Sequence, residues 1–181
     1  MILKICFYRK LFNGHKLMQL FSQYVRLSLR RNNFAKGSDF MQKYKFGNYQ
    51  AELDMDATMK WYAQFDGWGC ACGHCRNFLQ LARKKDLPEY MIAILDALGI
   101  PPEKATYVGE LFTDETGVHY QFSYRLAGVI IDSPNATADE TRNNIRCCHE
   151  PYPYGAPDFP EPHFDLEFYA TLPWVLEESQ N

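Results

Sequence analysis

The amino-acid sequence predicts an α+β domain in which an antiparallel sheet of about four strands carries a helix pair on one face. Segments with strict alternation of apolar and polar residues lie before and after a stretch with helical spacing. The order strand, helices, hairpin, strand favours antiparallel pairing, because parallel sheets need repeated strand–helix–strand units. With 181 residues, 46% of them hydrophobic, the chain can build one such domain with its own core.

The first expected strand covers residues 44–55, and its alternation continues on both sides of Gly47. We therefore interpret the glycine as a bulge or kink. Two helices follow, one at 76–85 and a second through Met91, Ile92, Leu95 and Leu98, and the short connection between them makes them antiparallel. Asp86 and Glu89 are the expected N-terminal cap of the second helix, Pro88 fits its first turn, and Gly99 ends it.

A hairpin is expected next, with strands at 105–112 and 118–131 joined by the turn at 114–117. Its second strand alternates cleanly, so one face should be core and the other wet. The wet face would carry His119, Gln121, Ser123 and Arg125. Residues 132–163 are expected to be loop, rich in proline towards the end, and residues 164–172 form the last strand.

Three cysteines, Cys70, Cys72 and Cys75, lie within six residues on a glycine-rich segment. Thiols at this density indicate metal binding or redox chemistry, because three neighbouring sulfurs cannot all pair with one another. A Cys-x-x-Cys step that leads into a helix is a common half-site for structural zinc, which takes four N or S ligands. The sequence thus predicts a zinc-stabilised domain with Zn²⁺ as its cofactor.

The fourth zinc ligand is expected from Cys147, Cys148 or His149, and Cys148 is the residue that we name. His74 lies inside the Cys72–Cys75 turn, where its geometry is less suitable. Other titratable groups give weaker signals. Glu103, Glu110, Asp165 and Glu167 are expected to be solvated on strand faces, and no catalytic residue is predicted.

Trp68 and the Cys72-Gly-His-Cys75 sequence also resemble the active-site segment of protein disulfide isomerases and thioredoxin-like proteins. That resemblance implies a thiol-disulfide oxidoreductase whose first thiolate lies at a helix N-terminus. It also implies a parallel strand–helix–strand unit, whereas the strands downstream of the cysteines are predicted to form hairpins. Redox chemistry is therefore the alternative to zinc.

The net charge of −3 conceals two regions of opposite sign. Residues 1–40 have a balance of +7, and residues 41–181 have a balance of −10. An acidic body argues against nucleic acid as its direct ligand, because contacts to phosphate need cations. It suits a partner with a basic surface, either a protein or a protein–RNA complex.

Residues 1–40 are predicted to be a basic arm separate from a single acidic domain at 41–181. Lys16 to Arg31 has apolar residues at helical spacing beside arginines, as in a basic amphipathic helix. A disordered arm and a translation start at Met41 are the other interpretations. The five residues 36–40 can be encoded by AAG-GGG-AGT-GAT-TTT, which contains a purine-rich ribosome-binding sequence just before a methionine codon. No apolar run is long enough to cross a bilayer, so the protein is expected in the cytoplasm.

The block from Cys70 to Phe78, Cys-x-Cys-x-x-Cys-x-Asn-Phe, and the ending from Leu166 to Trp174 resemble a group of small uncharacterised proteins from Gram-positive gut bacteria and their phages. In size and acidity, and in having no catalytic motif, the chain is also similar to metal-binding anti-CRISPR inhibitors of phages. These resemblances imply a non-enzymatic binding protein that inhibits a CRISPR effector nuclease through protein–protein interaction.

Overall fold

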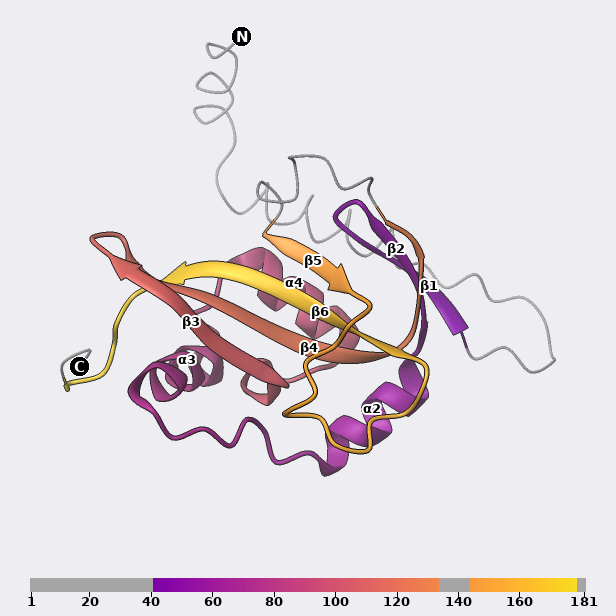
Figure 1. Cartoon of the computed structure of the whole chain (residues 1–181), viewed down its shortest axis with the longest axis horizontal. Helices are drawn as coiled ribbons and strands as arrows, with labels where there is room; N and C mark the ends of the chain where they lie inside the picture. The colour runs from indigo at the N-terminus through magenta and orange to yellow at the C-terminus, as the bar shows by residue number, and fades with distance from the viewer. Residues whose placement is uncertain (1–40, 134–143, 179–181) are drawn as a thin grey trace, which may run out of the picture. The chain divides into compact units, whose positions relative to one another are not determined.

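An antiparallel sheet of six strands forms the centre of the fold, in a computed structural model that describes residues 41–133 and 144–178 (Figure 1). The strands run in the order β1-β2-β4-β6-β5, and β3 pairs with the first part of β4 on the edge opposite β6. All of these pairings are antiparallel, as predicted. The strand bounds are β1 Met41–Phe46, β2 Tyr49–Asp54, β3 Tyr107–Asp114, β4 Gly117–Asp132, β5 Ile145–Cys148 and β6 His163–Leu172.

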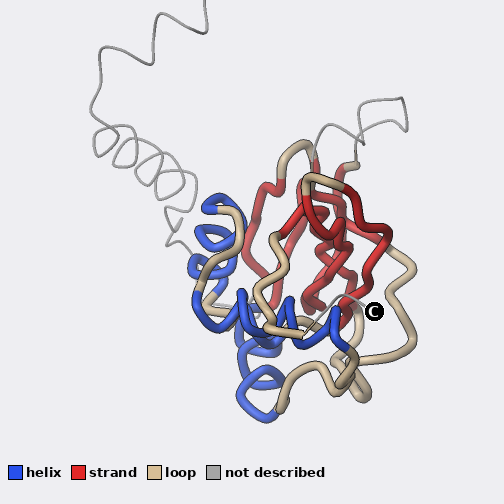
Figure 2. Tube along the Cα trace, turned by 90° about the vertical axis from the view of Figure 1, so that its left-hand side faces the viewer, coloured by secondary structure: helices blue, strands red, loops and turns tan. Residues whose placement is uncertain are grey.

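Three helices lie along one side of this sheet (Figure 2). They are α2 Met55–Gln64, α3 Gly73–Lys84 and α4 Glu89–Leu98, followed by the short 3₁₀ turn η2 Pro102–Lys104. The carboxylate of Asp54 caps α2 by accepting a hydrogen bond from the Ala57 N–H at 2.9 Å. Gly99 ends α4 in the left-handed conformation, as predicted. The expected cap of α4 is wrong, because Pro88 occupies that position without a side-chain hydrogen bond.

The expected count of about four strands and two helices is too low. Residues 41–54 form two strands rather than one, because Gly47 adopts a φ of 58° and turns the chain so that Phe46 pairs with Tyr49. β5 lies in a segment expected to be loop. The aromatic-rich segment at 57–65, for which no element is predicted, belongs to α2.

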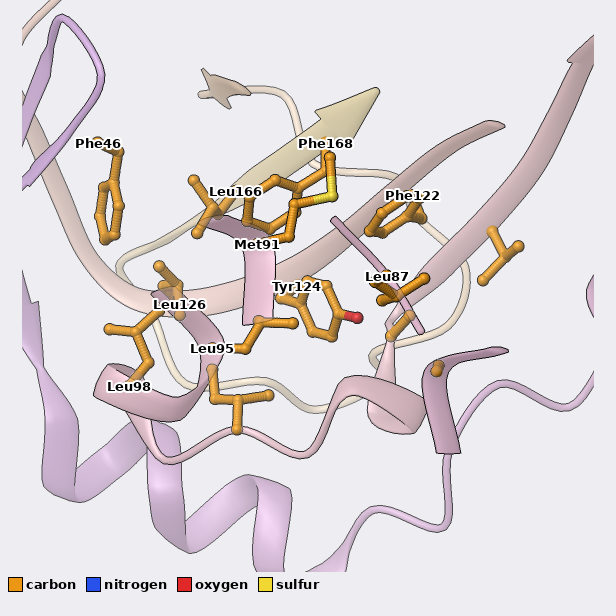
Figure 3. Packing of buried hydrophobic residues seen from close by; sticks show 14 of the residues in the cluster. Phe46, Leu87, Met91, Leu95, Leu98, Phe122, Tyr124, Leu126, Leu166 and Phe168 are labelled. Carbon is orange, nitrogen blue, oxygen red and sulfur yellow. The ribbon is translucent and has the colours of Figure 1, made fainter. Parts of the chain in front are cut away.

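The main core lies between the helices and the face of the sheet that we call the helix face. Met91, Leu95 and Leu98 project from α4 towards Tyr124 and the apolar side chains of β4 and β6 (Figure 3). All of these side chains are almost completely buried. On α3, Phe78 packs against Phe122 of β4 with ring centroids 4.7 Å apart. The alternation in β4 therefore predicted this face correctly.

The opposite face of β4 and β6, which we call the loop face, is also buried. Ser123 and Asp165 are fully buried there, and Arg125 is 4% exposed. The proline-rich loop at 149–162 covers them, and the carbonyl groups of Tyr152 and Ala156 accept hydrogen bonds from the Arg125 guanidinium. The predicted wet face is therefore wrong at this end of the sheet.

The basic arm predicted at residues 1–40 lies outside the described residues. Among the described residues, no helix has the length and apolar character required to cross a membrane.

Candidate metal centre

The three clustered cysteines converge at the start of α3. Cys72 is the N-cap residue of this helix, Cys75 lies in its first turn, and Cys70 precedes them in an irregular segment. All three sulfur atoms lie within 4.8 Å of one another, and the Sγ atoms of Cys70 and Cys72 are 3.4 Å apart. A tetrahedral zinc ion with Zn–S bonds of about 2.3 Å separates its sulfurs by about 3.8 Å. The cluster can therefore hold a metal ion with little rearrangement.

Cys75 forms the buried side of this cluster. Its thiol contacts the Val108 carbonyl of β3 at 3.9 Å, and Trp68 donates its indole N–H to the sulfur at 3.1 Å. Burial raises the pKa of the Cys75 thiol to about 12, against the lowering effect of the Trp68 hydrogen bond. Without a metal this thiol stays protonated at neutral pH, whereas a bound cation would stabilise the thiolate.

Cys70 and Cys72 form the exposed side of the cluster. The main cause of the lowered pKa of Cys70 is a hydrogen bond with the backbone of Cys72. Cys72 makes no side-chain cap to the helix, so its sulfur is free to turn to an ion.

Trp68 is held in place by two other parts of the chain. Its ring meets Tyr107 of β3 edge to face, with centroids 5.8 Å apart. A Cβ atom added to Gly155 would lie 2.7 Å from the Trp68 ring and 1.8 Å from the Thr106 carbonyl oxygen. The proline-rich loop therefore approaches both the indole and β3 closely, and only a glycine fits there. This links the loop face to the cysteine cluster.

Asn77, two residues after Cys75, fixes the other side of α3. Its buried amide donates to the Pro173 carbonyl at 3.0 Å and to the Tyr120 hydroxyl at 3.2 Å, and accepts from the Val175 N–H at 2.7 Å. The helix start is therefore bound to both β4 and the C-terminal segment. The sequence motif contains Asn77 but gave no role for it. Its position between Cys75 and Phe78 on an apolar helix face was the available signal.

The predicted fourth ligand does not join the cluster. No His, Cys, Asp or Glu beyond the three cysteines belongs to this group in the described parts of the chain. Cys147 and Cys148 lie on β5, which is separated from β3 by both β6 and β4. Cys148 pairs with Asp165 of β6, so its side chain lies on the loop face of the sheet. Cys75 lies on the opposite side. Residues 147–149 are therefore displaced from the centre by an unpredicted strand.

His74 packs against aromatic residues rather than joining the three cysteines. Its ring packs edge to face against Trp174 and Tyr120, with centroids 5.5 and 6.5 Å apart. It lies on the side of α3 that contacts the C-terminal segment rather than β3.

Two carboxylates that were expected to be solvated are buried instead. Asp165 pairs with the Arg125 guanidinium at 2.8 Å and accepts from the Tyr152 N–H at 3.0 Å. Glu167 is 2% exposed and accepts from the Tyr169 hydroxyl at 3.1 Å. Burial raises the pKa of Glu167, and the nearby Arg146 opposes the rise. These side chains belong to the loop face and lie outside the metal centre.

No known protein family matches this sequence, and no curated protein or solved structure is similar to it. The resemblances drawn from short motifs therefore remain predictions.

Proposed function

We propose that the three cysteines hold one zinc ion per chain and that this ion stabilises the domain. The observation that carries the proposal is the convergence of three sulfurs at a helix N-terminus, with an indole N–H directed at the buried one. Thiolates select soft and borderline metals, and zinc is the usual choice where several of them converge. Because Cys70 and Cys72 belong to the 66–72 segment and Cys75 belongs to α3, the ion would tie this segment to the start of the helix, beside β3.

Elemental analysis of protein purified without added metal tests the zinc proposal, with one zinc per chain as the expected result. Cys72→Ser should lose the zinc and unfold or aggregate, since metal binding contributes directly to folding. Cys148→Ser is the matched control, because Cys148 lies outside the cluster, and it should keep a full zinc complement. Metal-free protein that folds normally would contradict the proposal.

The function proposed for this zinc-stabilised domain is non-enzymatic binding to a basic surface on another macromolecule. The charge of −10 over residues 41–181 supports it, since such a charge speeds encounter with cationic surfaces. Carboxylates dominate the C-terminal segment, where residues 147–178 contain no Lys or Arg. Glu150, Asp158 and Glu161 are exposed there.

A CRISPR effector nuclease loaded with guide RNA is the partner to test first, because its nucleic-acid channel is cationic. Complex formation is measured by size exclusion, and target cleavage is measured across a salt series. Binding that weakens with salt and blocks cleavage supports the anti-CRISPR function. The triple variant Glu150→Gln, Asp158→Asn, Glu161→Gln should bind at least about tenfold more weakly.

The control for this experiment neutralises three exposed carboxylates on the helix side, Asp56, Asp86 and Glu89. It changes the net charge by the same amount at a different place. An equal loss of binding in both variants would indicate a general charge effect rather than a docking surface. Unimpaired cleavage at saturating protein, with effectors from several hosts, would contradict the inhibitor function.

Thiol-disulfide exchange is the second candidate function, and the 3.4 Å approach of Cys70 and Cys72 is the observation that favours it. The antiparallel pairing of the described strands and the high pKa of Cys75 give the Cys72–Cys75 pair less support. Turnover in an insulin-reduction assay by zinc-free protein would establish the redox function.

A further inference from the structure

We propose that the zinc centre has one coordination position open to solvent, and that this position binds a histidine imidazole from a macromolecular partner. The inference rests on the proposed zinc function and adds the ligand class of the same site. It starts from the count of donors, since zinc takes four ligands in a tetrahedron and the described chain brings three sulfurs together.

The open position follows from which sulfurs are buried. Cys75 is 5% exposed and lies against Val108 and the indole of Trp68, whereas Cys70 and Cys72 are exposed. An ion held by all three would have protein behind it and solvent in front. The remaining vertex of the tetrahedron would then point outwards, where water can occupy it until another donor arrives.

The described part of the chain offers no donor of its own for this vertex. The Cys147–His149 segment is separated from the cluster by two strands, and Cys148 faces the other side of the sheet. The His74 ring packs between Trp174 and Tyr120. Both of the other Cys and His groups named from the sequence are therefore excluded by their position in the fold.

Charge selects the class of external ligand. Three thiolates around a divalent ion already give the centre a net charge of −1, and residues 41–181 add a charge of −10 around it. The nearest cation on α3, Arg76, is already paired with Glu178. A fourth thiolate or carboxylate would add further negative charge, whereas a neutral imidazole would not. Three cysteines and one histidine also form an established zinc ligand set.

The same charge argues against a catalytic role for the open position. Catalytic zinc sites also combine three protein ligands with a water molecule, and they act by lowering the pKa of that water. Three thiolates donate electron density to the ion and make it a weaker Lewis acid than three neutral histidines do. The open vertex is therefore better suited to hold a ligand than to activate water.

Cobalt substitution of the full chain tests the open position, because Co²⁺ reports its ligands through its visible spectrum. Co²⁺ binding should produce sulfur-to-metal charge-transfer bands in wild type and in the Cys148→Ser control. Titration with 1-methylimidazole should then shift the d–d bands in a saturable manner, with one imidazole per cobalt. Acetate and 2-mercaptoethanol test anionic donors in the same titration. Each should need a concentration at least tenfold higher than that of 1-methylimidazole to shift the d–d bands.

The outcomes separate the two proposals. If the chain binds neither cobalt nor zinc, the zinc function itself fails. If it binds cobalt and the spectrum does not respond to imidazole, the centre is already complete and the open position is overturned. Tighter binding of the thiol than of imidazole would overturn the ligand class. Zinc-dependent dimers in sedimentation, abolished by His149→Ala, would assign the donor to a second copy and overturn the separate partner.

Discussion

The two faces of the sheet are both buried, but by different means. The helix face is covered by α3 and α4 and is filled with aromatic and aliphatic side chains such as Phe122 and Leu95 (Figure 3). The loop face is covered by an irregular proline-rich segment over a charged pair, Arg125 and Asp165. Apolar burial holds the helices in place, whereas the loop combines the apolar burial of Phe159 with hydrogen bonds to the Arg125–Asp165 pair. An irregular loop can therefore cover a sheet if buried charges anchor its backbone.

The largest predicted effect comes from breaking the Arg125–Asp165 ion pair, which anchors the loop face. Asp165→Ala leaves the Arg125 guanidinium buried without its counter-charge, and we expect it to lower the free energy of unfolding by about 3–5 kcal/mol. Urea unfolding gives the value. The double variant Arg125→Met, Asp165→Leu should recover most of the loss, because no charge is then left unpaired. A double variant as unstable as the single one would show that the loop does not depend on the pair.

A truncation on the helix face should have a somewhat smaller effect. Leu95→Ala removes a fully buried side chain of α4 and leaves a cavity against Tyr124, which should lower stability by about 2–4 kcal/mol. Ile131→Ala, which truncates a side chain that is 45% exposed, is the control and should change stability little. In hydrogen-exchange measurements, Leu95→Ala should speed amide exchange in the helices and the sheet together. A loop-face variant should not show this pattern.

Gly155→Ala tests whether the loop face and the metal centre are coupled. The new Cβ would collide with the Thr106 carbonyl oxygen at a φ of 90°, so we expect a loss of about 1–3 kcal/mol. Because the same atom reaches Trp68, zinc affinity should fall as well, as measured by competition with a chelator. Gly69→Ala is the matched control beside the cysteines, since a Cβ there meets nothing within 4 Å. Unchanged zinc affinity in Gly155→Ala would show that the regions are independent.

The smallest predicted effect concerns the charge of Glu167. Burial raises its pKa in the folded state above the value of the unfolded chain, so ionisation opposes folding at neutral pH. Glu167→Gln should therefore stabilise the protein at pH 7, by less than about 1 kcal/mol. The gain should shrink as the pH falls through the raised folded-state pKa, and it should be gone below about 4, where the carboxyl is protonated in both states. Exposed Glu177→Gln is the control, and a gain that grows towards low pH would contradict the assignment.

The sequence predicted the helix face well because its signals are local. The apolar spacing of α4, the stop at Gly99 and the alternation of β4 each depend on neighbouring residues. The three-cysteine cluster was likewise visible because its ligands lie within six residues. The alternation of apolar and polar residues identifies the two faces of a strand. It does not indicate whether a distant segment covers the polar face.

The missed features depend on contacts between distant residues. β5 has only four residues, and its pairing with β6 is set by the sheet rather than by its own pattern. That pairing also places Cys148 away from the three clustered cysteines, so the missed strand bears directly on the choice of fourth ligand. Asp165 gave no local sign of its burial because its partner Arg125 comes from another strand.

The position of β4 also determines the order in which the chain can fold. Of the three pairings that β4 makes, only the one with β3 joins neighbouring residues, with Asp114 paired to Gly117 at the tip of the hairpin. The other two partners of β4 close long loops, as in the pairs Leu53–Gly128 and Val118–Leu172 (Figure 1). Long loops must lose chain entropy before their contacts are gained, which slows folding. The β3–β4 hairpin is therefore the least costly of the β4 pairings to form, and β6 must be synthesised before the sheet can close.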